Sequence, residues 1–231
     1  REALVAHLER EYDGRPDLLA KAVPEYPPYA KRMLRDDGAW ARTLKRDDVT
    51  LISEPIAEIA ERGVVTAGGT LHEADVIIYG TGFQASMFLP GMTVTGRGGA
   101  DLHRQWAGDP RAHIGITVPN FPNLFLLYGP NTNLVVNGSI VMFSELEVNY
   151  VLECLKTLLQ SPYRTMECRQ EALDGFCSRV DEASARMAFG LPGVRSWYKN
   201  AAGRVTQNWP LTTLEFWRMT RRPEPGDYEF S

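Results

Sequence analysis

The spacing of hydrophobic residues changes along the chain and predicts strands mainly in the first half and helices in the second. Apolar residues recur at helical spacing within residues 2–12, and a short second helix is predicted over 17–22. Pro24, Pro27 and Pro28 then force an extended segment, since proline restricts both its own backbone and that of the preceding residue. A further short helix is predicted to begin at residue 37 or 38 and to end at 44.

Short apolar and β-branched runs after this region are typical of strands. Strands are predicted over residues 49–52, 56–60, 64–66, 75–79 and 124–128. Residues 67–70 carry a tight-turn signal. In the run at 75–79, Asp75 is followed by apolar residues only, which predicts a strand buried on both faces. Residues 84–111 are rich in glycine, proline and charge, and predict an irregular surface segment.

The last third of the chain has the periodicity of amphipathic helices. Helices are predicted over 139–160, 171–188 and 213–220, with a loop between 190 and 212. One face of the first of these helices carries Ile140, Phe143, Leu146, Tyr150, Cys154 and Leu158. We also expect Phe121, Phe125 and Tyr128 to lie in the core. The fold class predicted is α/β.

Composition narrows the class of protein. Hydrophobic residues make up 44% of the 231 positions and charged residues 23%, as in ordinary soluble domains. A net charge of -4 argues against a nucleic-acid partner, and no apolar stretch is long enough to span a membrane. Cys154, Cys168 and Cys177 form no CxxC pair, which favours free thiols in the cytoplasm. The four histidines lack metal-ligand spacing, so no metal site is predicted.

Two predicted strands end in glycine turns, at residues 80–82 and 129–131. In α/β proteins, ligands bind beyond the carboxyl ends of strands, where glycine lets the backbone approach them closely. Neither turn has the GxGxxG pattern of dinucleotide-binding loops, and that pattern is absent from the chain. From the glycines alone, a structural role is as well supported as a functional one.

Four motifs together carry a resemblance to a known family. The run DVIIYGTGF at 75–83 resembles the D-x-apolar-A-T-G-F segment of class B flavoprotein monooxygenases, with glycine at position 80 where the family usually has alanine. Residues 119–125 with 129–131 resemble that family's P-N-apolar strand leading to G-P-N. Residues 26–32 with Asp36 resemble the segment that carries its Lys-Arg pair, and 196–203 resemble its late tryptophan loop. The chain therefore resembles flavin-dependent Baeyer–Villiger monooxygenases, and within them the 4-hydroxyacetophenone monooxygenase-like enzymes.

This resemblance implies the C-terminal part of a flavoprotein with two Rossmann-like dinucleotide-binding domains and a helical C-terminal region. Residues 1–82 would complete the NADP-binding domain and its return linker, and residues 83–231 would complete the FAD-binding domain. The family's glycine-rich loops for FAD and NADP precede the matched region. We therefore expect a missing N-terminal half, on the same polypeptide or another chain. Alone, this chain is expected to be inactive and not to retain FAD.

The resemblance also implies roles for seven residues. Arg32 would be the catalytic cation that stabilises negative charge during oxygen insertion, since arginine stays protonated and offers a rigid fork of donors. Lys31 would approach the 2′-phosphate of NADP. The other expected cofactor-binding residues are Thr81 and Gly82 at the flavin–NADP junction, Asn131 and Thr132 with backbone amides at the flavin ring, and Trp197 near the nicotinamide or substrate.

The implied reaction inserts one oxygen atom of dioxygen beside a ketone carbonyl and gives an ester, with NADPH and FAD as cofactors. A second hypothesis is an N- or S-oxygenating flavin monooxygenase. The adjacent Lys31 and Arg32 favour the first, because those enzymes lack that pair. A third hypothesis, favoured by the missing GxGxxG, is a non-catalytic α/β fragment without flavin.

Overall fold

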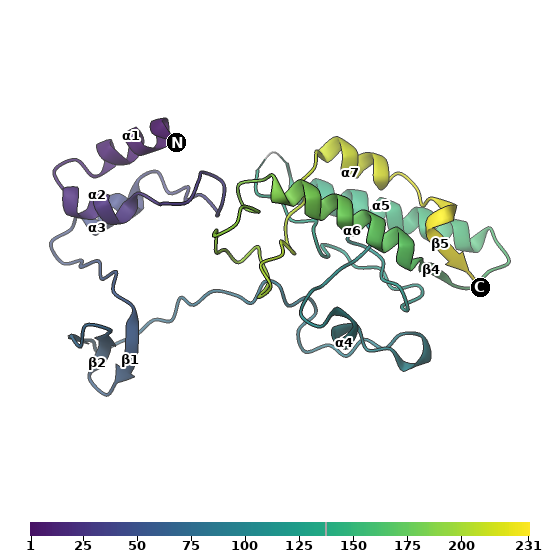
Figure 1. Cartoon of the computed structure of the whole chain (residues 1–231), viewed down its shortest axis with the longest axis horizontal. Coiled ribbons are helices and arrows are strands. Elements are labelled where there is room, and N and C mark those ends of the chain that lie inside the picture. The colour runs from purple at the N-terminus through teal and green to yellow at the C-terminus, as the bar shows by residue number, and fades with distance from the viewer. Residues whose placement is uncertain (137) are drawn as a thin grey trace. The chain divides into compact units, whose positions relative to one another are not determined.

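The computed structural model describes residues 1–136 and 138–231, and these divide into two compact units. The first unit comprises residues 1–27 and 33–83, and the second comprises 28–32 and 84–231. Figure 1 shows helices and a small sheet in the first unit and a group of longer helices in the second. The assignment of these parts to NADP- and FAD-binding domains stays a prediction.

Three short helices form the helical part of the first unit: α1 (Glu2–Glu11), α2 (Pro16–Ala22) and α3 (Ala39–Leu44). Each lies where the apolar spacing predicts it. Proline begins α2, a position where its missing N–H costs nothing. Tyr12, Leu18, Ala41 and Leu44 form the buried core between them. Residues 49–52 were wrongly predicted as a strand, because Val49 and Leu51 pack against this core from an irregular segment.

The sheet of the first unit has three antiparallel strands in the order β1 (Ile56–Ala60), β2 (Gly63–Thr66) and β3 (Leu71–Glu73). Gly63 pairs with Glu73 at a close approach, where an added Cβ would lie 2.1 Å from the carbonyl oxygen of His72. Only glycine fits there. The strands predicted at 56–60 and 64–66 and the turn between β2 and β3 are confirmed.

The predicted strand at 75–79, buried on both faces, is not present. Val76 is 76% exposed and Ile78 is 90% exposed, in an extended segment without strand pairing. A buried strand needs a hydrogen-bonded neighbour on each side, and the described residues supply neither to this run. The exposed apolar residues are the kind of surface that a further part of a protein covers.

The second unit contains α4 (Leu102–Trp106), α5 (Ile140–Leu159), α6 (Gln170–Ala185) and α7 (Thr213–Met219). Two short strands, β4 (Met166–Cys168) and β5 (Tyr228–Phe230), pair in antiparallel fashion beside them, and single 3-10 turns occur at Arg97–Gly99 and Pro225–Asp227. The main core lies between α5, α6 and α7 (Figure 1). At its centre the rings of Phe143 and Phe216 stack with centroids 4.2 Å apart.

Two further expectations for the second unit are wrong. Residues 124–128 form no strand, although the Leu126 N–H donates to the carbonyl oxygen of Ile116 at 2.8 Å. The segment 84–111 is not merely irregular surface, since Leu102 and Trp106 of α4 are buried in a second core with Phe121. Elements of three to five residues have too few positions to show a period, which is why α4, β4 and β5 escaped prediction.

Cys154, Cys168 and Cys177 are buried free thiols, as predicted. Burial raises the pKa of the Cys154 and Cys168 thiols to about 12, so both stay protonated. Across the described ranges, no helix is both long and apolar enough to cross a membrane. Nor do three His, Cys, Asp or Glu side chains gather there where they could hold a metal ion.

Buried His113 makes the stability of the second unit depend on pH. Its Nδ1 lies 3.2 Å from the carbonyl oxygen of Ala172, and its Nε2 lies 3.4 Å from the Asp227 carboxylate. Burial lowers the pKa of His113, and Asp227 opposes that shift without cancelling it. Below about pH 6.5 the unfolded state therefore binds more protons than the folded state, so the free energy of unfolding should fall as the solution is acidified.

The measurement is urea unfolding of the chain near neutral pH and again about one to two pH units lower, for the wild type and His113→Gln. Glutamine keeps a donor for Ala172 but does not titrate. The variant should lose less stability than the wild type over this interval. Equal losses in both proteins would show that His113 is not responsible.

Candidate functional site

The predicted catalytic arginine belongs to a short segment that packs with the second unit. Within Pro28–Arg32, Ala30 is fully buried, and Tyr29 has a left-handed backbone with φ of 66°. This anchored tight bend carries Lys31 and the exposed Arg32. The sequence predicts this bend only in part. The prolines at 24–28 exclude a helix, but they do not show which residues the segment packs against.

Arg32 lies near two phenol groups, those of Tyr128 and Tyr198. Burial raises the pKa of each phenol, and the positive charge of Arg32 acts against that increase at both. Tyr198 is buried, whereas Tyr128 is 43% exposed and was wrongly predicted as a core residue. The cluster therefore combines an exposed cation with two neutral hydroxyl groups.

The turn that follows residue 128 has an unusual backbone. Tyr128 and Asn131 both have left-handed conformations, with φ of 58° and 63°. Gly129 lies against Gly115, and an added Cβ there would meet the Gly115 carbonyl oxygen at 2.0 Å. The N–H of Tyr128 donates to the buried carboxylate of Glu147 on α5 at 2.8 Å, and its hydroxyl donates to Asn133 at 2.7 Å. Burial raises the pKa of the Glu147 carboxyl.

Residues 131–133 pair with residues 206–209, so the turn rests on the late loop of the second unit. The N–H groups of Asn131 and Asn133 donate to the carbonyl oxygens of Thr206 and Gln207, each at 2.9 Å. Asn131 and Thr132 are buried, and the Thr132 hydroxyl donates to Gly129 at 2.8 Å. The Asn131 N–H, expected as a donor to the flavin ring, is thus used within the chain.

Trp197 lies beside the same cluster. Its ring centroid is 4.4 Å from that of Tyr198, and its side chain is 47% exposed. An exposed tryptophan held against a buried tyrosine is available to stack on a ligand. The Tyr128–Tyr198 pair is therefore common to three features. The ring of Trp197 contacts Tyr198, the charge of Arg32 acts on both phenols, and Tyr128 begins the turn at 128–132.

Thr81 and Gly82 belong to the first unit and are described separately from the cluster in the second. Both are exposed, and Gly82 has a left-handed φ of 81° with open space around the position of a Cβ. Their expected place at the flavin–NADP junction stays a prediction, as do the roles of the other five residues.

Three residues of the cluster were missed by sequence reasoning: Tyr198, Glu147 and Arg204. Glu147 carried a detectable signal, because this acid stands on α5 between Phe143 and Tyr150 on the helix face that the spacing predicts to be buried. A buried carboxylate is costly unless it is paired or functional. Tyr198 stands in the tryptophan-loop motif at 196–203, although no role was predicted for it. Arg204, which donates to the Asn131 side chain at 3.2 Å, carried no such signal, since this partner is remote in sequence.

No protein-family model matches the chain. It is 34% identical over 229 residues to an uncharacterized monooxygenase, y4iD, of Sinorhizobium fredii, covering 99% of this chain and 34% of that protein. It is 35% identical over 215 residues to a Baeyer-Villiger monooxygenase of Streptomyces coelicolor, covering 93% of this chain and 41% of that protein. A solved oxidized steroid monooxygenase bound to NADP matches with a TM-score of 0.80 and 26% identity, over 98% of this chain and 44% of that one.

The chain spans less than half the length of these relatives. Its similarity, in sequence and in fold, is to a C-terminal portion of flavin-dependent monooxygenases with α/β architecture. Within that class it resembles the Baeyer–Villiger monooxygenases, as its four motifs predict, and the predicted resemblance and fold class are confirmed.

Proposed function

We propose that this chain supplies the C-terminal part of an NADPH- and FAD-dependent monooxygenase that inserts oxygen beside a ketone carbonyl to give an ester. The observation that carries the proposal is that Arg32 belongs to the second unit and that its positive charge acts on the phenols of Tyr128 and Tyr198, at the turn of residues 128–132. The relatives' names and the extent of the match support it. The ketone, dioxygen and an N-terminal half carrying the glycine-rich loops are its partners, and we propose a cytoplasmic location.

The residues around the turn fit a flavin ring, whose edge is rich in hydrogen-bond acceptors. The buried amide nitrogen Nδ2 of Asn208 has no hydrogen-bond partner among the described residues, although its Oδ1 accepts from Asn133 at 2.9 Å. A buried donor without an acceptor is costly, and a bound acceptor removes that cost. When bound, and once NADPH has reduced the flavin, FAD supplies the activation of dioxygen.

Each residue of the cluster then has a distinct task. Thr132 and Trp197 would hold the cofactors, and Lys31 would bind the 2′-phosphate of NADP as a compact cation. Asn131, whose N–H and side chain bond within the chain, would contribute to cofactor binding by shaping the turn. Arg32 would orient the ketone oxygen and stabilise the negative charge that develops on it. The phenols of Tyr128 and Tyr198 keep their protons, because burial raises the pKa of both, so neither adds negative charge near Arg32.

We expect the chain expressed alone to bind no FAD that survives dialysis. A glycine-rich loop before a helix supplies most contacts to the pyrophosphate of dinucleotides, and this chain has no GxGxxG. The measurement is the flavin absorbance of the purified chain, beside the same chain joined to the N-terminal region of the Streptomyces coelicolor relative. Flavin should appear only in the joined protein. Near-stoichiometric flavin in the chain alone would contradict the proposal that FAD binding needs the glycine-rich loop of an N-terminal half.

A further inference from the structure

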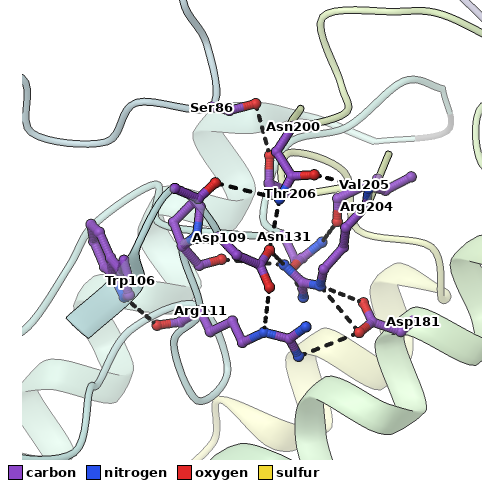
Figure 2. Close-up of polar contacts among 12 residues, drawn as sticks. Ser86, Trp106, Asp109, Arg111, Asn131, Asp181, Asn200, Arg204, Val205 and Thr206 are labelled. Carbon is purple, nitrogen blue, oxygen red and sulfur yellow. Dashed lines mark hydrogen bonds and ion pairs between the residues drawn. The ribbon is translucent and has the colours of Figure 1, made fainter. Parts of the chain in front are cut away.

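Arg204 is the centre of an ion-pair network in the second unit that the chemistry above does not use (Figure 2). Its Nε donates to both carboxylate oxygens of Asp181, at 2.9 and 3.1 Å, and its Nη1 donates to Asp109 at 3.2 Å. Its Nη2 donates to the side-chain oxygen of Asn131, also at 3.2 Å. Nη1 also donates to the carbonyl oxygen of Pro110 at 3.2 Å. The side chain is only 11% exposed, and the planar guanidinium donates to four acceptor groups.

The contact with Asn131 completes the hydrogen bonding of that side chain. The amide nitrogen Nδ2 of Asn131 donates to the carbonyl oxygens of Val205 at 2.9 Å and Asn208 at 3.3 Å. Its oxygen accepts from Arg204, which determines which end of the amide faces which partner. Asn131 has a left-handed backbone, a conformation that asparagine adopts more readily than other residues with a side chain.

The same network reaches the tryptophan loop. The N–H of Arg204 donates to the side-chain oxygen of Asn200 at 3.0 Å, and the Asn200 amide donates to Asp109 at 2.8 Å. Asn200 follows Trp197 by three positions. One arginine therefore contacts both the turn that carries Asn131 and the loop that carries Trp197.

We propose that Arg204 is a positioning residue of this site: it holds the Asn131 side chain, and through it the turn at 129–132, in the orientation that receives the cofactor. That Arg204 holds the Asn131 side chain and the turn is the structural half of this inference, and it rests on the hydrogen bonds alone. That the turn receives the cofactor rests on the proposed function. Asp181 on α6 and Asp109 hold Arg204 in place by their charge. A different nitrogen of Arg204, Nη2, makes the hydrogen bond to Asn131 in the turn.

Arg111 provides a matched control within the same network. Its Nε donates to Asp109 at 2.8 Å and its Nη1 lies 3.4 Å from Asp181, so it shares both carboxylates with Arg204. Its described contacts do not include Asn131 (Figure 2). Loss of Arg111 thus removes one cation from the same acids without removing the hydrogen bond to the turn.

The first experiment measures amide hydrogen exchange in this chain for the wild type, Arg204→Gln, Arg204→Lys and Arg111→Gln. The N–H groups of Asn131 and Asn133 report opening of the turn, and amides in the middle of α5 report global unfolding. Relative to α5, exchange at the turn should rise about tenfold or more in both Arg204 variants, since a hydrogen bond from a charged donor is lost. Arg111→Gln should leave that ratio within about threefold of the wild type.

The lysine variant keeps the charge beside Asp109 and Asp181, so it tests the inference even where Arg204→Gln unfolds. Its single ammonium group cannot reach the four acceptor groups that the guanidinium reaches. An unchanged turn in Arg204→Lys, or equal opening in Arg111→Gln, would refute the positioning role and leave Arg204 as a general structural ion pair.

The second experiment uses the complete enzyme and compares FAD affinity and the shape of the flavin absorption band in the same variants. We expect both Arg204 variants to bind FAD at least tenfold more weakly with an altered band, and Arg111→Gln to resemble the wild type. If the turn opens in both Arg204 variants but no version of the complete protein binds FAD, the proposed function fails and the structural half of the inference stands. If FAD binds normally in all variants, the turn does not need Arg204 to receive the cofactor.

Discussion

Replacing Arg32 by alanine in the complete enzyme is expected to lower ester formation by about two to three orders of magnitude and to leave reduction of the flavin by NADPH largely intact. Oxygen insertion develops negative charge on the ketone oxygen, and a preorganised cation stabilises that charge. Hydride transfer from NADPH develops no such oxyanion. The positive charge of Arg32 acts on the pKa of the Tyr128 and Tyr198 phenols, which is consistent with a place close to this cluster.

The measurement pairs anaerobic stopped-flow reduction of the flavin with ester formation under air. Arg32→Lys should restore little activity, because an ammonium lacks the planar fork. Arg35→Ala is the matched control, since Arg35 is an exposed arginine three positions further along the chain. An alanine variant at position 32 that makes ester near the wild-type rate would reduce Arg32 to a surface charge. Equal loss of reduction and oxygenation would instead indicate a role in cofactor binding or folding.

Replacing Phe143 by alanine is expected to destabilise the second unit by about 3–5 kcal/mol, a large fraction of the roughly 5–15 kcal/mol by which an ordinary domain is stable. Phe143 is fully buried on α5 and stacks on Phe216 of α7 at 4.2 Å, with Trp209 packed at its edge. Its removal leaves a cavity between two helices, and α5 also carries the Glu147 that holds the turn at Tyr128.

Urea unfolding of the chain, followed by circular dichroism, measures this effect. Val141→Ala is the control on the same helix, because Val141 is 64% exposed and its truncation should change stability by no more than about 0.5 kcal/mol. A cost for Phe143→Ala as small as that of the control would mean that the core of the second unit does not lie between α5 and α7 as described.

Helices were predictable from this sequence because their pattern is local. The spacing of apolar residues alone located α1, α2, α5, α6 and α7, with ends within a few residues of those observed. Strand predictions succeeded only where the partner strand is adjacent, as for β1 and β2. The runs at 75–79 and 124–128 have strand composition but no pairing among the described residues, and composition cannot show whether a partner exists.

The candidate site residues came from the motifs, and their roles stay predictions. The resemblance pointed to Arg32, Asn131 and Trp197, and the structure places these three residues around one cluster in the second unit. It did not reveal that Arg204 contacts Asn131, because that contact depends on how two loops 73 positions apart in sequence pack together. Convergence of remote side chains is a property of the fold and not of any local spacing.

The most direct test of the proposed chemistry supplies the complete enzyme with NADPH, a ketone and oxygen-18 gas, and analyses the products by mass spectrometry. An alkyl or aryl ketone, an amine and a thioether are offered separately. The proposal predicts an ester that contains one oxygen-18 atom, formed from the ketone. Oxygenation of the amine or thioether without any ester would assign the protein to the N- or S-oxygenating enzymes, and no labelled product from any of the three would contradict a monooxygenase altogether.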